Sequence, residues 1–514
     1  DEAKRSYERS IQLKPDFSEA LVNLGNLMHA QGLTEDCLEH FKEAMCIDPQ
    51  SFRFRWCYTI CQLPKVAVSQ GAFRDSYDRF ESEIESACML FDDNSSESAT
   101  ELVGRPFPYY LAYFESNNRS ILETHGKLCA RMMKKWMARN NIVSHDRVSN
   151  NLRKRARIGI VSAHIHYHSV WNAFLKGIVT KLDTTKFELH IFSLSHKNDD
   201  QTEIAKQKAN KFHADIGELP HWAKKIIHCE IDILFFPEIG MDHKTVQLAS
   251  MRLAPVQVCS YGHPETSGLP TMDYYISSEL LEEENPNAAY SEKLIKLPGL
   301  GYYFEPGSLG CSSLDLTEFG LHERAPKLLC LGAPNKFSPL YDSVFIEIIR
   351  RVKNCQLIFM HDYLGSSRIL EERLRSEIHQ AKMAEQERLV FVPQLNREGF
   401  NSLMQTSHVL LDPIGFSGLN TAMQAVGCCV PIITREGKFQ RTKHASAILK
   451  VLELEELIAK SEQEYVSLVA KVVLDPKYLN YVKSKMRLRE SLLYANEAPI
   501  RALESFFETA AERH

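Results

Sequence analysis

A glycine-rich turn that opens a helix is the clearest candidate for ligand chemistry in this sequence. Residues 412–421 read DPIGFSGLNT and directly follow an apolar run typical of a buried strand. Gly415 and Gly418 let the backbone turn tightly and approach a ligand, and Asn420 and Thr421 then begin a helix. Free N–H groups and the positive dipole end at a helix start bind phosphate oxygens, so the turn predicts a phosphate site. The alternative is an ordinary strand-to-helix turn with Asn420 as its cap.

Lys336 is the candidate cation for the same ligand. It lies in GAPNKFSP, residues 332–339, just after another apolar run, and Pro339 sits near the first turn of the next helix. Lys336 is therefore expected in the loop over the carboxyl end of a strand, where a point positive charge neutralises a departing diphosphate. Alone it would be interpreted as a solvated lysine, but both features belong to the same edge of one sheet. The sequence has no dinucleotide-binding glycine fingerprint and no Walker-type loop, which argues against dehydrogenases and P-loop enzymes.

Two loops that carry histidine follow other apolar runs. His168 ends the string HIHYH, and His263 begins HPETSG. Taken singly, each histidine is explained as well by a structural or surface role as by a role in an active site. HIHYH has no cysteine or carboxylate nearby at ligand spacing, so we expect no metal site there and chemistry without a metal cofactor.

Charge and cysteine usage exclude several classes of protein. The chain has 514 residues and a formal net charge of −5, which does not fit a general nucleic-acid binder or a membrane-surface protein. Thirteen cysteines without regular spacing argue against a disulfide framework and for a reducing compartment, so we expect a cytoplasmic protein. The sequence begins without a signal-peptide core, and no apolar run approaches the ~20 residues that a bilayer crossing needs.

The first fifty residues repeat with a period of 34, which is typical of tetratricopeptide repeats. Small residues let antiparallel helices approach, aromatic residues fill the groove, and prolines end each second helix. The matching positions are Ala3, Tyr7, Ser10, Ile11 and Pro15 in the first unit and Cys37, Phe41, Ala44, Met45 and Pro49 in the second. The alternative is a generic helical hairpin. A solenoid with so few repeats lacks the neighbouring repeats on which each unit stacks. We therefore expect the segment to belong to a longer array. Residues 51–152 then predict a helical connector in which we identify no chemistry.

From residue 153 onward, strands alternate with helices. Apolar runs at 157–162, 187–193, 231–236 and 255–261 predict one parallel sheet, and runs at 327–332, 356–360, 388–392, 408–412 and 430–434 predict a second. A segment rich in Gly, Ser and Pro at about 298–326 separates them. We therefore predict an α/β fold of two Rossmann-like domains, 153–310 and 311–514, after an all-α segment. Ligands of such sheets bind at the carboxyl ends of the strands, in the cleft between the halves.

Several motifs in order resemble the O-GlcNAc transferase family of inverting glycosyltransferases. Residues 261–274, YGHPETSGLPTMDY, resemble its GYPGTSG…MDY segment, and residues 290–294 read YSEKL as in the family. Lys336 stands where the family has the lysine of the UDP diphosphate. The likeness covers about residues 153–514, and the N-terminal repeats fit the family's architecture. The resemblance implies a GT-B fold, a UDP-sugar as the donor substrate bound by the second half, acceptor binding by the first half and no metal.

The resemblance also assigns roles to individual residues. His168 matches the active-site histidine of the family's DFGNHP segment, and Asp215 matches an acidic residue of the cleft, so both are candidate bases beside Lys336. Phe400 falls where relatives place a ring against uracil. The UDP-sugar-binding residues implied in this way are Lys336, Leu395, Phe400, Gly418, Asn420, Thr421, His263 and Pro264.

The acceptor atom and the donor sugar stay open in the sequence. The phosphate loop of the O-GlcNAc enzymes reads GHTTG, whereas GLNTA at 418–422 is closer to the GNTNG of bacterial adhesin N-glucosyltransferases, and His263 also matches that branch. SGLPTMDY and the repeats, which would bind acceptor polypeptides, favour the O-linked branch and its plant fucosyltransferase relatives.

We therefore expect transfer of a sugar, GlcNAc before glucose or fucose, from UDP to Ser or Thr with inversion. The alternatives are an N-glucosyltransferase acting on Asn in Asn-X-Ser/Thr, for which Glu238 and Glu265 are candidate carboxylates, and a non-catalytic repeat scaffold. A transferase for lipids or small metabolites is a further competitor, against which the repeats argue.

Overall fold

The N-terminal repeats form antiparallel helices with a small core of their own. The computed structural model describes residues 2–91, 97–144, 154–306, 310, 315–383 and 386–512, with the backbone alone at 97 and 98. Its first helices are α1 (Glu2–Leu13), α2 (Ser18–Ala30), α3 (Thr34–Ile47) and α4 (Phe52–Ile60). A side chain at Gly25 would collide with the fully buried ring of Phe41, so this glycine lets α2 and α3 approach closely.

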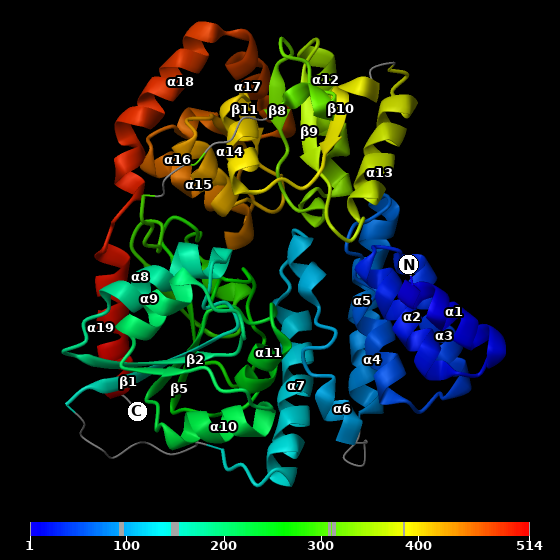
Figure 1. Cartoon of the computed structure of the whole chain (residues 1–514), viewed down its shortest axis with the longest axis vertical. Coiled ribbons are helices and arrows are strands. Elements are labelled where there is room, and N and C mark those ends of the chain that lie inside the picture. The colour runs from blue at the N-terminus through cyan, green and yellow to red at the C-terminus, as the bar shows by residue number, and fades with distance from the viewer. Residues whose placement is uncertain are drawn as a thin grey trace.

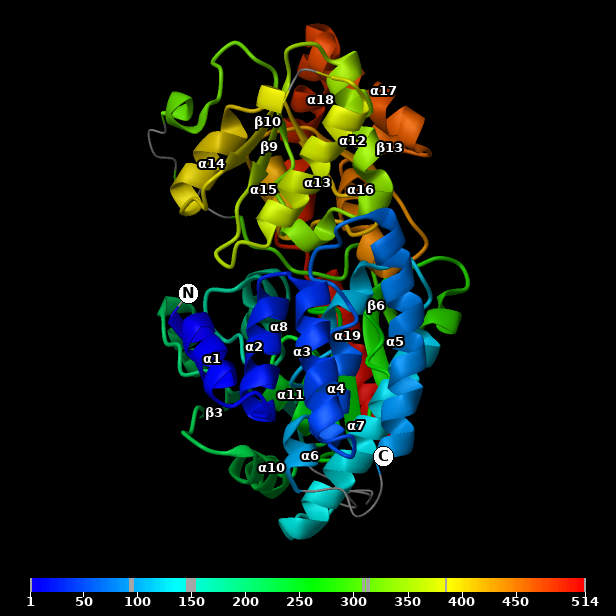
Figure 2. The same cartoon turned by 90° about the vertical axis from the view of Figure 1, so that its right-hand side faces the viewer.

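The connector continues as helices that lie along the two α/β halves. It contains α5 (Gln70–Leu90), α6 (Glu97–Glu101), a short 3₁₀ turn η1 (Tyr109–Tyr113) and α7 (Arg119–Arg139). In Figures 1 and 2, α7 runs beside the first half, while α5 extends up to the second half. Lys65 Nζ lies 3.1 Å from Asp362 Oδ2, so the helical region also docks on the second half through an ion pair.

The first half is a parallel sheet with helices on both faces. Its strands are β1 (Ala156–Ser162), β2 (Phe187–Ser193), β3 (Lys211–His213), β4 (Ile233–Phe236), β5 (Val256–Ser260), β6 (Tyr274–Ser278) and β7 (Lys293–Leu297), in the order β3-β2-β1-β4-β5-β6-β7. The helices are α8 (Lys176–Lys181), α9 (Asp200–Lys208), α10 (Leu219–His228) and α11 (His243–Ala249). The central strands are buried on both faces, which is why they appear in the sequence as continuous apolar runs.

The second half repeats this architecture. Its strands are β8 (Lys327–Leu329), β9 (Gln356–Met360), β10 (Leu389–Val392), β11 (Val409–Leu411), β12 (Ile432–Arg435) and β13 (Ile458–Ala459), in the order β10-β9-β8-β11-β12-β13. Around them lie α12 (Asp342–Arg351), α13 (Ser367–Gln380), α14 (Arg397–Gln405), α15 (Asn420–Gly427), α16 (His444–Val451), α17 (Glu462–Leu474) and α18 (Pro476–Arg489). The prediction of two Rossmann-like domains after an all-α segment is confirmed. No helix in the described ranges is long and apolar enough to cross a membrane.

The last helix, α19 (Ala498–Glu512), returns to the first half (Figure 1). It contacts α8, β4 and β7, and the fully buried Phe507 packs near Phe187 of β2. The backbone N–H of Asp183 donates to Glu504 Oε1 at 2.7 Å. The chain end that the sequence analysis assigned to 311–514 therefore completes the core of the other half.

The strand order of each sheet determines where the loops with the candidate site residues lie. Each sheet reverses its winding once, between β1 and β4 in the first half and between β8 and β11 in the second. Ligands of open parallel sheets bind outside the carboxyl ends of the strands at this point. The loops after β8 and β11 carry Lys336 and the DPIGFSGLNT turn, and the loop after β1 carries the histidine string.

Candidate active site between the two halves

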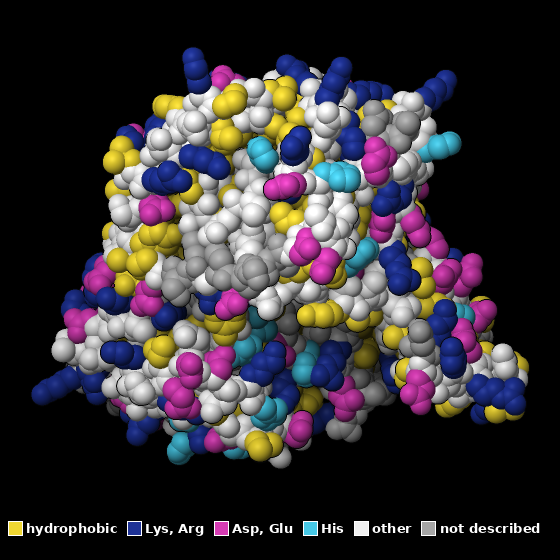
Figure 3. Space-filling view, turned by 45° about the horizontal axis from the view of Figure 1, so that its top comes forward, with side chains coloured by type: hydrophobic (Ala, Val, Ile, Leu, Met, Phe, Trp, Pro, Cys, Tyr) yellow, Lys and Arg dark blue, Asp and Glu magenta, His cyan; other side chains and the backbone are white. Residues whose placement is uncertain are grey.

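A cavity of about 260 Å³ lies between the two α/β halves. Both sheets contribute loops to it, and so does the connector. Figure 3 shows histidine side chains gathered on the first half along the edge that faces the second. The residues that matter below are Tyr109 and Tyr113 from the connector, Ser169, Val170, Tyr261, Pro264 and Tyr302 from the first half, and Lys336, Phe416, Asn420, Thr421 and His444 from the second.

Lys336 ends a 3₁₀ turn, Pro334–Lys336, and its side chain lines the cavity. Its Nζ lies 4.9 Å from the centroid of the Phe416 ring. Desolvation lowers the pKa of Lys336, and the nearby Asp412 carboxylate partly opposes this effect. The ammonium is therefore poorly solvated and has no ion-pair partner within 4.0 Å among the described residues, which suits a charge that binds an anionic ligand.

Asp412 fixes the shape of the glycine-rich turn. Its carboxylate accepts hydrogen bonds from Ser417 Oγ at 2.7 Å, the Gly418 N–H at 2.8 Å and Thr434 Oγ1 at 2.7 Å. Burial raises the pKa of Asp412 to about 6, while these donors and Lys336 favour the charged form. Gly415 has a φ of +93°, a conformation that few other residues adopt. The sequence analysis treated Asp412 only as the start of the turn, whereas the structure shows that it organises the turn.

The turn delivers the start of α15 to the cavity. The residue before the helix is Leu419, whose side chain makes no capping hydrogen bond. The first N–H groups of α15 can therefore donate to backbone, water or a ligand. Asn420 and Thr421 line the cavity together with Lys336, so the predicted meeting of the two features at one sheet edge is confirmed. Asn420 also borders an adjoining cavity of about 400 Å³, which Arg397 lines from the start of α14.

The histidine string packs against itself beside the cavity. The His164 and His168 rings stack with centroids 3.9 Å apart, and His168 Nδ1 accepts a hydrogen bond from the Val170 N–H at 3.2 Å. Burial, together with the two neighbouring histidines, lowers the pKa of His168 to about 3. His168 is thus neutral at physiological pH, as a general base must be. Ser169 and Val170 line the cavity itself, and His168 directly precedes them.

Glu238 lies beneath this loop, in the segment after β4. It is fully buried, Oε1 accepts from the Ala163 N–H at 3.0 Å, and Oε2 has no partner among the described residues. Burial raises the pKa of Glu238 to about 8. The group is therefore mainly protonated at neutral pH, which makes it a poor source of a carboxylate for polarising an amide.

The connector supplies aromatic walls that the sequence analysis missed. Tyr109 stacks on His263 with centroids 4.7 Å apart, and Tyr113 stacks on Phe416 at 4.4 Å. Burial lowers the pKa of His263 to about 3, so this ring is neutral as well. The only signal in the sequence was the dense aromatic string PYYLAYF at 108–114, which belongs to no motif and lies in a connector without a predicted strand.

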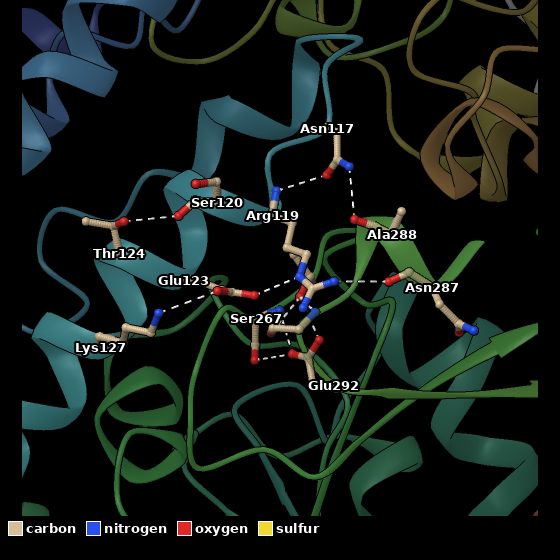
Figure 4. Close-up of polar contacts among 12 residues, drawn as sticks. Asn117, Arg119, Ser120, Glu123, Thr124, Lys127, Ser267, Asn287, Ala288 and Glu292 are labelled. Atoms are coloured by element: carbon tan, nitrogen blue, oxygen red, sulfur yellow. Dashed lines mark hydrogen bonds and ion pairs between the residues drawn. The ribbon is translucent and has the colours of Figure 1, made fainter. Parts of the chain in front are cut away.

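The HPETSG loop and the YSEKL segment, which the family resemblance identified separately, are joined by hydrogen bonds. Glu292 of YSEKL accepts from Thr266 Oγ1 at 2.6 Å, from the Ser267 N–H at 2.8 Å and from the Ser267 hydroxyl. Figure 4 shows Ser267 and Glu292 beneath α7, whose Arg119 pairs with Glu123 at 2.7 Å and reaches the loop at Asn287. Glu292 thus holds the HPETSG loop, and Arg119 of the connector holds the segment at Asn287 that precedes Glu292.

A buried ion pair joins the two halves behind this loop. Arg441 of the second half pairs with Glu265 of the first, and Asn118 Nδ2 donates to Glu265 at 3.1 Å. Arg441 also donates to the carbonyl oxygens of Phe114 and Ser116, each at 2.7 Å. Burial raises the pKa of Glu265 and Arg441 opposes this. Glu265 is therefore occupied in holding both halves and the connector together.

His444 is a second cavity residue that the sequence analysis missed. It begins α16, and its Nδ1 lies 2.6 Å from the hydroxyl of Tyr302. Burial, with the positive charge of Lys336, lowers the pKa of His444 to about 3. It is a neutral histidine on the wall shared with Lys336. No sequence motif marked it, because it comes from the loop after β12 and meets Tyr302 from the other half.

The remaining predicted residues are not all brought together. Pro264 lines the cavity, and Gly418 borders a small adjoining space with Lys336. Phe400 in α14 and Leu395 before it are half-buried and pack against the core, near Arg397 of the adjoining cavity. Asp215 does not line the cavity: it follows the edge strand β3, and its Oδ2 pairs with His221 at 2.9 Å and Lys225 at 3.2 Å.

Comparison with known proteins assigns the chain to a family. The profile of glycosyl transferase family 41 matches residues 108–304 and 320–498, well over half of the chain. The chain belongs to this family. The fold of this chain is similar to that of a solved structure, a mutant of the Thermobaculum terrenum O-GlcNAc transferase, with a TM-score of 0.73 and 21% identity over 99% of this chain and 94% of that one. The GT-B type of fold is thereby confirmed.

Two curated proteins with different named activities are similar to this chain. A probable UDP-N-acetylglucosamine–peptide N-acetylglucosaminyltransferase SPINDLY of Petunia hybrida is 26% identical over 389 residues, 73% of this chain and 40% of that protein. A UDP-glucose:protein N-beta-glucosyltransferase of Actinobacillus pleuropneumoniae serotype 5b (strain L20) is 22% identical over 314 residues, 59% of this chain and 48% of that protein. The chain thus spans less than half the length of these curated relatives. The resemblance to the O-GlcNAc transferase family is confirmed.

The family match starts inside the connector. It begins at residue 108, whereas the sequence analysis placed the start of the likeness at about 153. The additional residues include Tyr109 and Tyr113 of the cavity and Asn118 of the buried network. Residues 108–118 therefore lie within the family match, and this part of the connector contributes Tyr109 and Tyr113 to the candidate site.

Proposed function

We propose that this chain transfers a sugar, GlcNAc as the first candidate, from a UDP-sugar to Ser or Thr hydroxyls of proteins with inversion at the anomeric carbon. The observation that carries the proposal is the meeting of Lys336, the Asp412-organised turn and the start of α15 at the β8–β11 reversal, on a cavity that faces the first half. This arrangement provides positive charge and N–H donors for a diphosphate leaving group. Membership of family 41 supports a glycosyl transfer.

In the proposed reaction the leaving group is stabilised without a metal. Lys336 and the positive end of α15 take up the charge that develops on the β-phosphate as the glycosidic bond breaks. The half-buried surroundings of Lys336 strengthen this interaction, because water screens it less. The acceptor hydroxyl loses its proton late in the reaction, so a strong base is not required. His168 is the base candidate that we retain, since the structure directs Asp215 to His221 and Lys225 instead.

A hydroxyl acceptor is favoured over an asparagine amide by the state of the two candidate carboxylates. An amide nitrogen is a poor nucleophile and needs a charged carboxylate to polarise or twist it. Glu265 is bound by Arg441 and Asn118, and Glu238 is fully buried with a raised pKa. The N-glucosyltransferase alternative is kept because of the GLNT turn and the relatives of that branch. The repeat helices α1 to α3 are proposed to bind acceptor polypeptide.

Titration of UDP by calorimetry, with and without EDTA, tests the donor site. We expect binding of UDP in both conditions, and strict dependence on magnesium or manganese would contradict the proposal. Absence of any UDP binding would favour the scaffold alternative.

A panel of nucleotide sugars with candidate acceptor peptides, lipids and small metabolites, read by intact mass, identifies the donor and the acceptor class. β-Elimination of the product then releases sugar from Ser or Thr. Sugar retained on Asn within Asn-X-Ser/Thr would overturn the hydroxyl assignment.

A further inference from the structure

Two histidines and a cysteine converge at the edge of the first sheet, apart from the cavity between the halves. They are His190 on β2, His213 on β3 and Cys229 at the end of α10, and one ligand atom from each lies within 4.8 Å of the others. Cys229 Sγ is 3.8 Å from His213 Nε2. In the part of the chain that the structure describes, no other three His, Cys, Asp or Glu side chains are grouped in this way. None of the three lines the cavities described above.

The sheet geometry explains why these residues meet. Phe192 pairs in register with His213, and His190 pairs with Lys211, so His190 and His213 lie on the same face of neighbouring strands, one diagonal step apart. Their rings are 5.7 Å apart. Helix α10 ends at His228, and Cys229 directly follows it as the C-cap residue, with its thiol in contact with the His213 ring. The spacing 190–213–229 forms no sequence motif, so the sequence analysis expected no metal site here.

His190 is already arranged as a metal-binding histidine. Its Nε2 lies 3.0 Å from Glu188 Oε1, so the proton is placed on Nε2 and the lone pair on Nδ1. The residue is only 4% exposed, and its buried Nδ1 has no hydrogen-bond partner in the described part of the chain. A carboxylate that holds the far nitrogen of a ligating histidine is the usual outer partner of a zinc ligand. An unpartnered buried nitrogen is costly unless something binds it.

The charges around the cluster are compatible with a bound cation. Burial raises the pKa of the Cys229 thiol, while Lys225 and Arg157 act in the opposite direction and favour the thiolate. Arg157 is itself paired with Glu188 and Glu230, each at 3.3 Å, and Lys225 with Asp215 at 3.2 Å. The pKa of His213 is lowered to about 4, mainly by burial, so this ring is neutral and able to bind a metal. Arg157 and Lys225 are thus balanced by carboxylates, while the exposed Lys211 on β3 adds a positive charge beside the cluster.

We propose that His190, His213 and Cys229 form a zinc site with a fourth position open to water or an added ligand. Zinc takes nitrogen at about 2.0–2.1 Å and thiolate sulfur at about 2.3 Å in tetrahedral geometry, which sets a sulfur–nitrogen separation of about 3.6 Å. The 3.8 Å between Cys229 Sγ and His213 Nε2 is close to this value. The ligand atoms of all three residues lie within 4.8 Å of one another, so zinc binding requires His190 to move closer to this pair. Bound zinc ties the short edge strand β3 and the end of α10 to β2.

Titration of the metal-free purified chain with Co²⁺ tests the site. A thiolate ligand gives a charge-transfer band in the near ultraviolet, and tetrahedral Co²⁺ gives intense visible bands. We expect both bands to saturate at one equivalent and to disappear on addition of Zn²⁺. Zn²⁺ is also expected to raise the thermal unfolding midpoint.

Matched variants separate this site from other metal binding. Cys229→Ser should abolish the charge-transfer band, and His190→Gln should weaken Co²⁺ binding on the order of 10–100-fold or more. Cys46→Ser removes an exposed thiol on α3 and should change neither signal. Cys229→Ala serves as a second thiol-free variant, and circular dichroism checks its fold. Lack of a charge-transfer band in the unmodified chain, or a band that persists in a folded Cys229 variant, overturns the proposal.

Discussion

Replacement of Lys336 by methionine should separate catalysis from stability. Methionine keeps most of the volume of the side chain and removes only the charge. One charge on a leaving phosphate contributes roughly 2–4 kcal/mol to the transition state, so turnover should fall on the order of 10²–10³-fold. UDP affinity should fall as well, because the ammonium faces the cavity.

The structure predicts that the fold tolerates this change. The lowered pKa of Lys336 means that its surroundings disfavour the charged form, so a neutral side chain gains from burial. The contact with the Phe416 ring is lost, at a cost of about 1–2 kcal/mol. Asp412 keeps its three hydrogen-bond donors. The two effects oppose each other, and we expect the free energy of unfolding to change by no more than about 1 kcal/mol.

The assay combines UDP release in the presence of an acceptor with calorimetric titration of UDP and urea unfolding. Lys353→Met, at an exposed position after α12, is the matched control and should leave all three unchanged. A loss of turnover smaller than about fivefold in a folded Lys336→Met protein would refute the assignment of Lys336 to the diphosphate. A loss of stability of several kcal/mol would refute the argument from its surroundings.

Three further predictions concern the framework of the site. Arg441→Met should destabilise the fold by about 3–5 kcal/mol because it leaves the buried Glu265 without its cation, and adding Glu265→Gln should restore much of this in a double-mutant cycle. Glu238 has a pKa raised to about 8, so the folded state holds its proton where the unfolded state does not, and the free energy of unfolding should fall by about 2 kcal/mol between pH 6 and pH 8. Glu238→Gln should flatten that slope, measured by urea unfolding at each pH, and an unchanged slope contradicts the assignment. Gly126→Ala should cost about 2 kcal/mol because the new methyl group meets the Gly268 carbonyl oxygen at 2.2 Å. Gly71→Ala in α5 meets only the Ser69 hydroxyl, at an ordinary contact distance of 3.9 Å, and should be neutral or stabilising. Equal effects of the two substitutions on the free energy of unfolding would contradict the close approach of α7 to Gly268.

The sequence alone predicted the architecture and the meeting of Lys336 with the 412–421 turn at one cavity. Apolar runs alternating with helical periodicity predicted the two parallel sheets, because strands buried on both faces need apolar residues at nearly every position. Lys336 and the turn from Asp412 to Thr421 were identified for a similar reason. A ligand site at the carboxyl edge of a sheet is built from residues next to the strands, so strand and loop appear together in the sequence.

Tertiary structure decided the rest of the site, because its other members come from segments far apart in the chain. Tyr109 and Tyr113 lie in a connector without strand or motif, and only the fold brings them against His263 and Phe416. The exclusion of Asp215 from the cavity follows from the position of β3 at the sheet edge, which residue type does not reveal.

The same distinction holds for the buried groups. The residue type of Glu265 does not indicate its partner. Its pairing with Arg441, 176 residues further along the chain, depends on how the two halves meet in the fold. His190, His213 and Cys229 converge through the register of β2 and β3 and the end of α10. Local sequence therefore determines strands, turns and helix starts, since these depend on neighbours along the chain. Side-chain pairing across elements depends on packing and desolvation, which only the folded arrangement specifies.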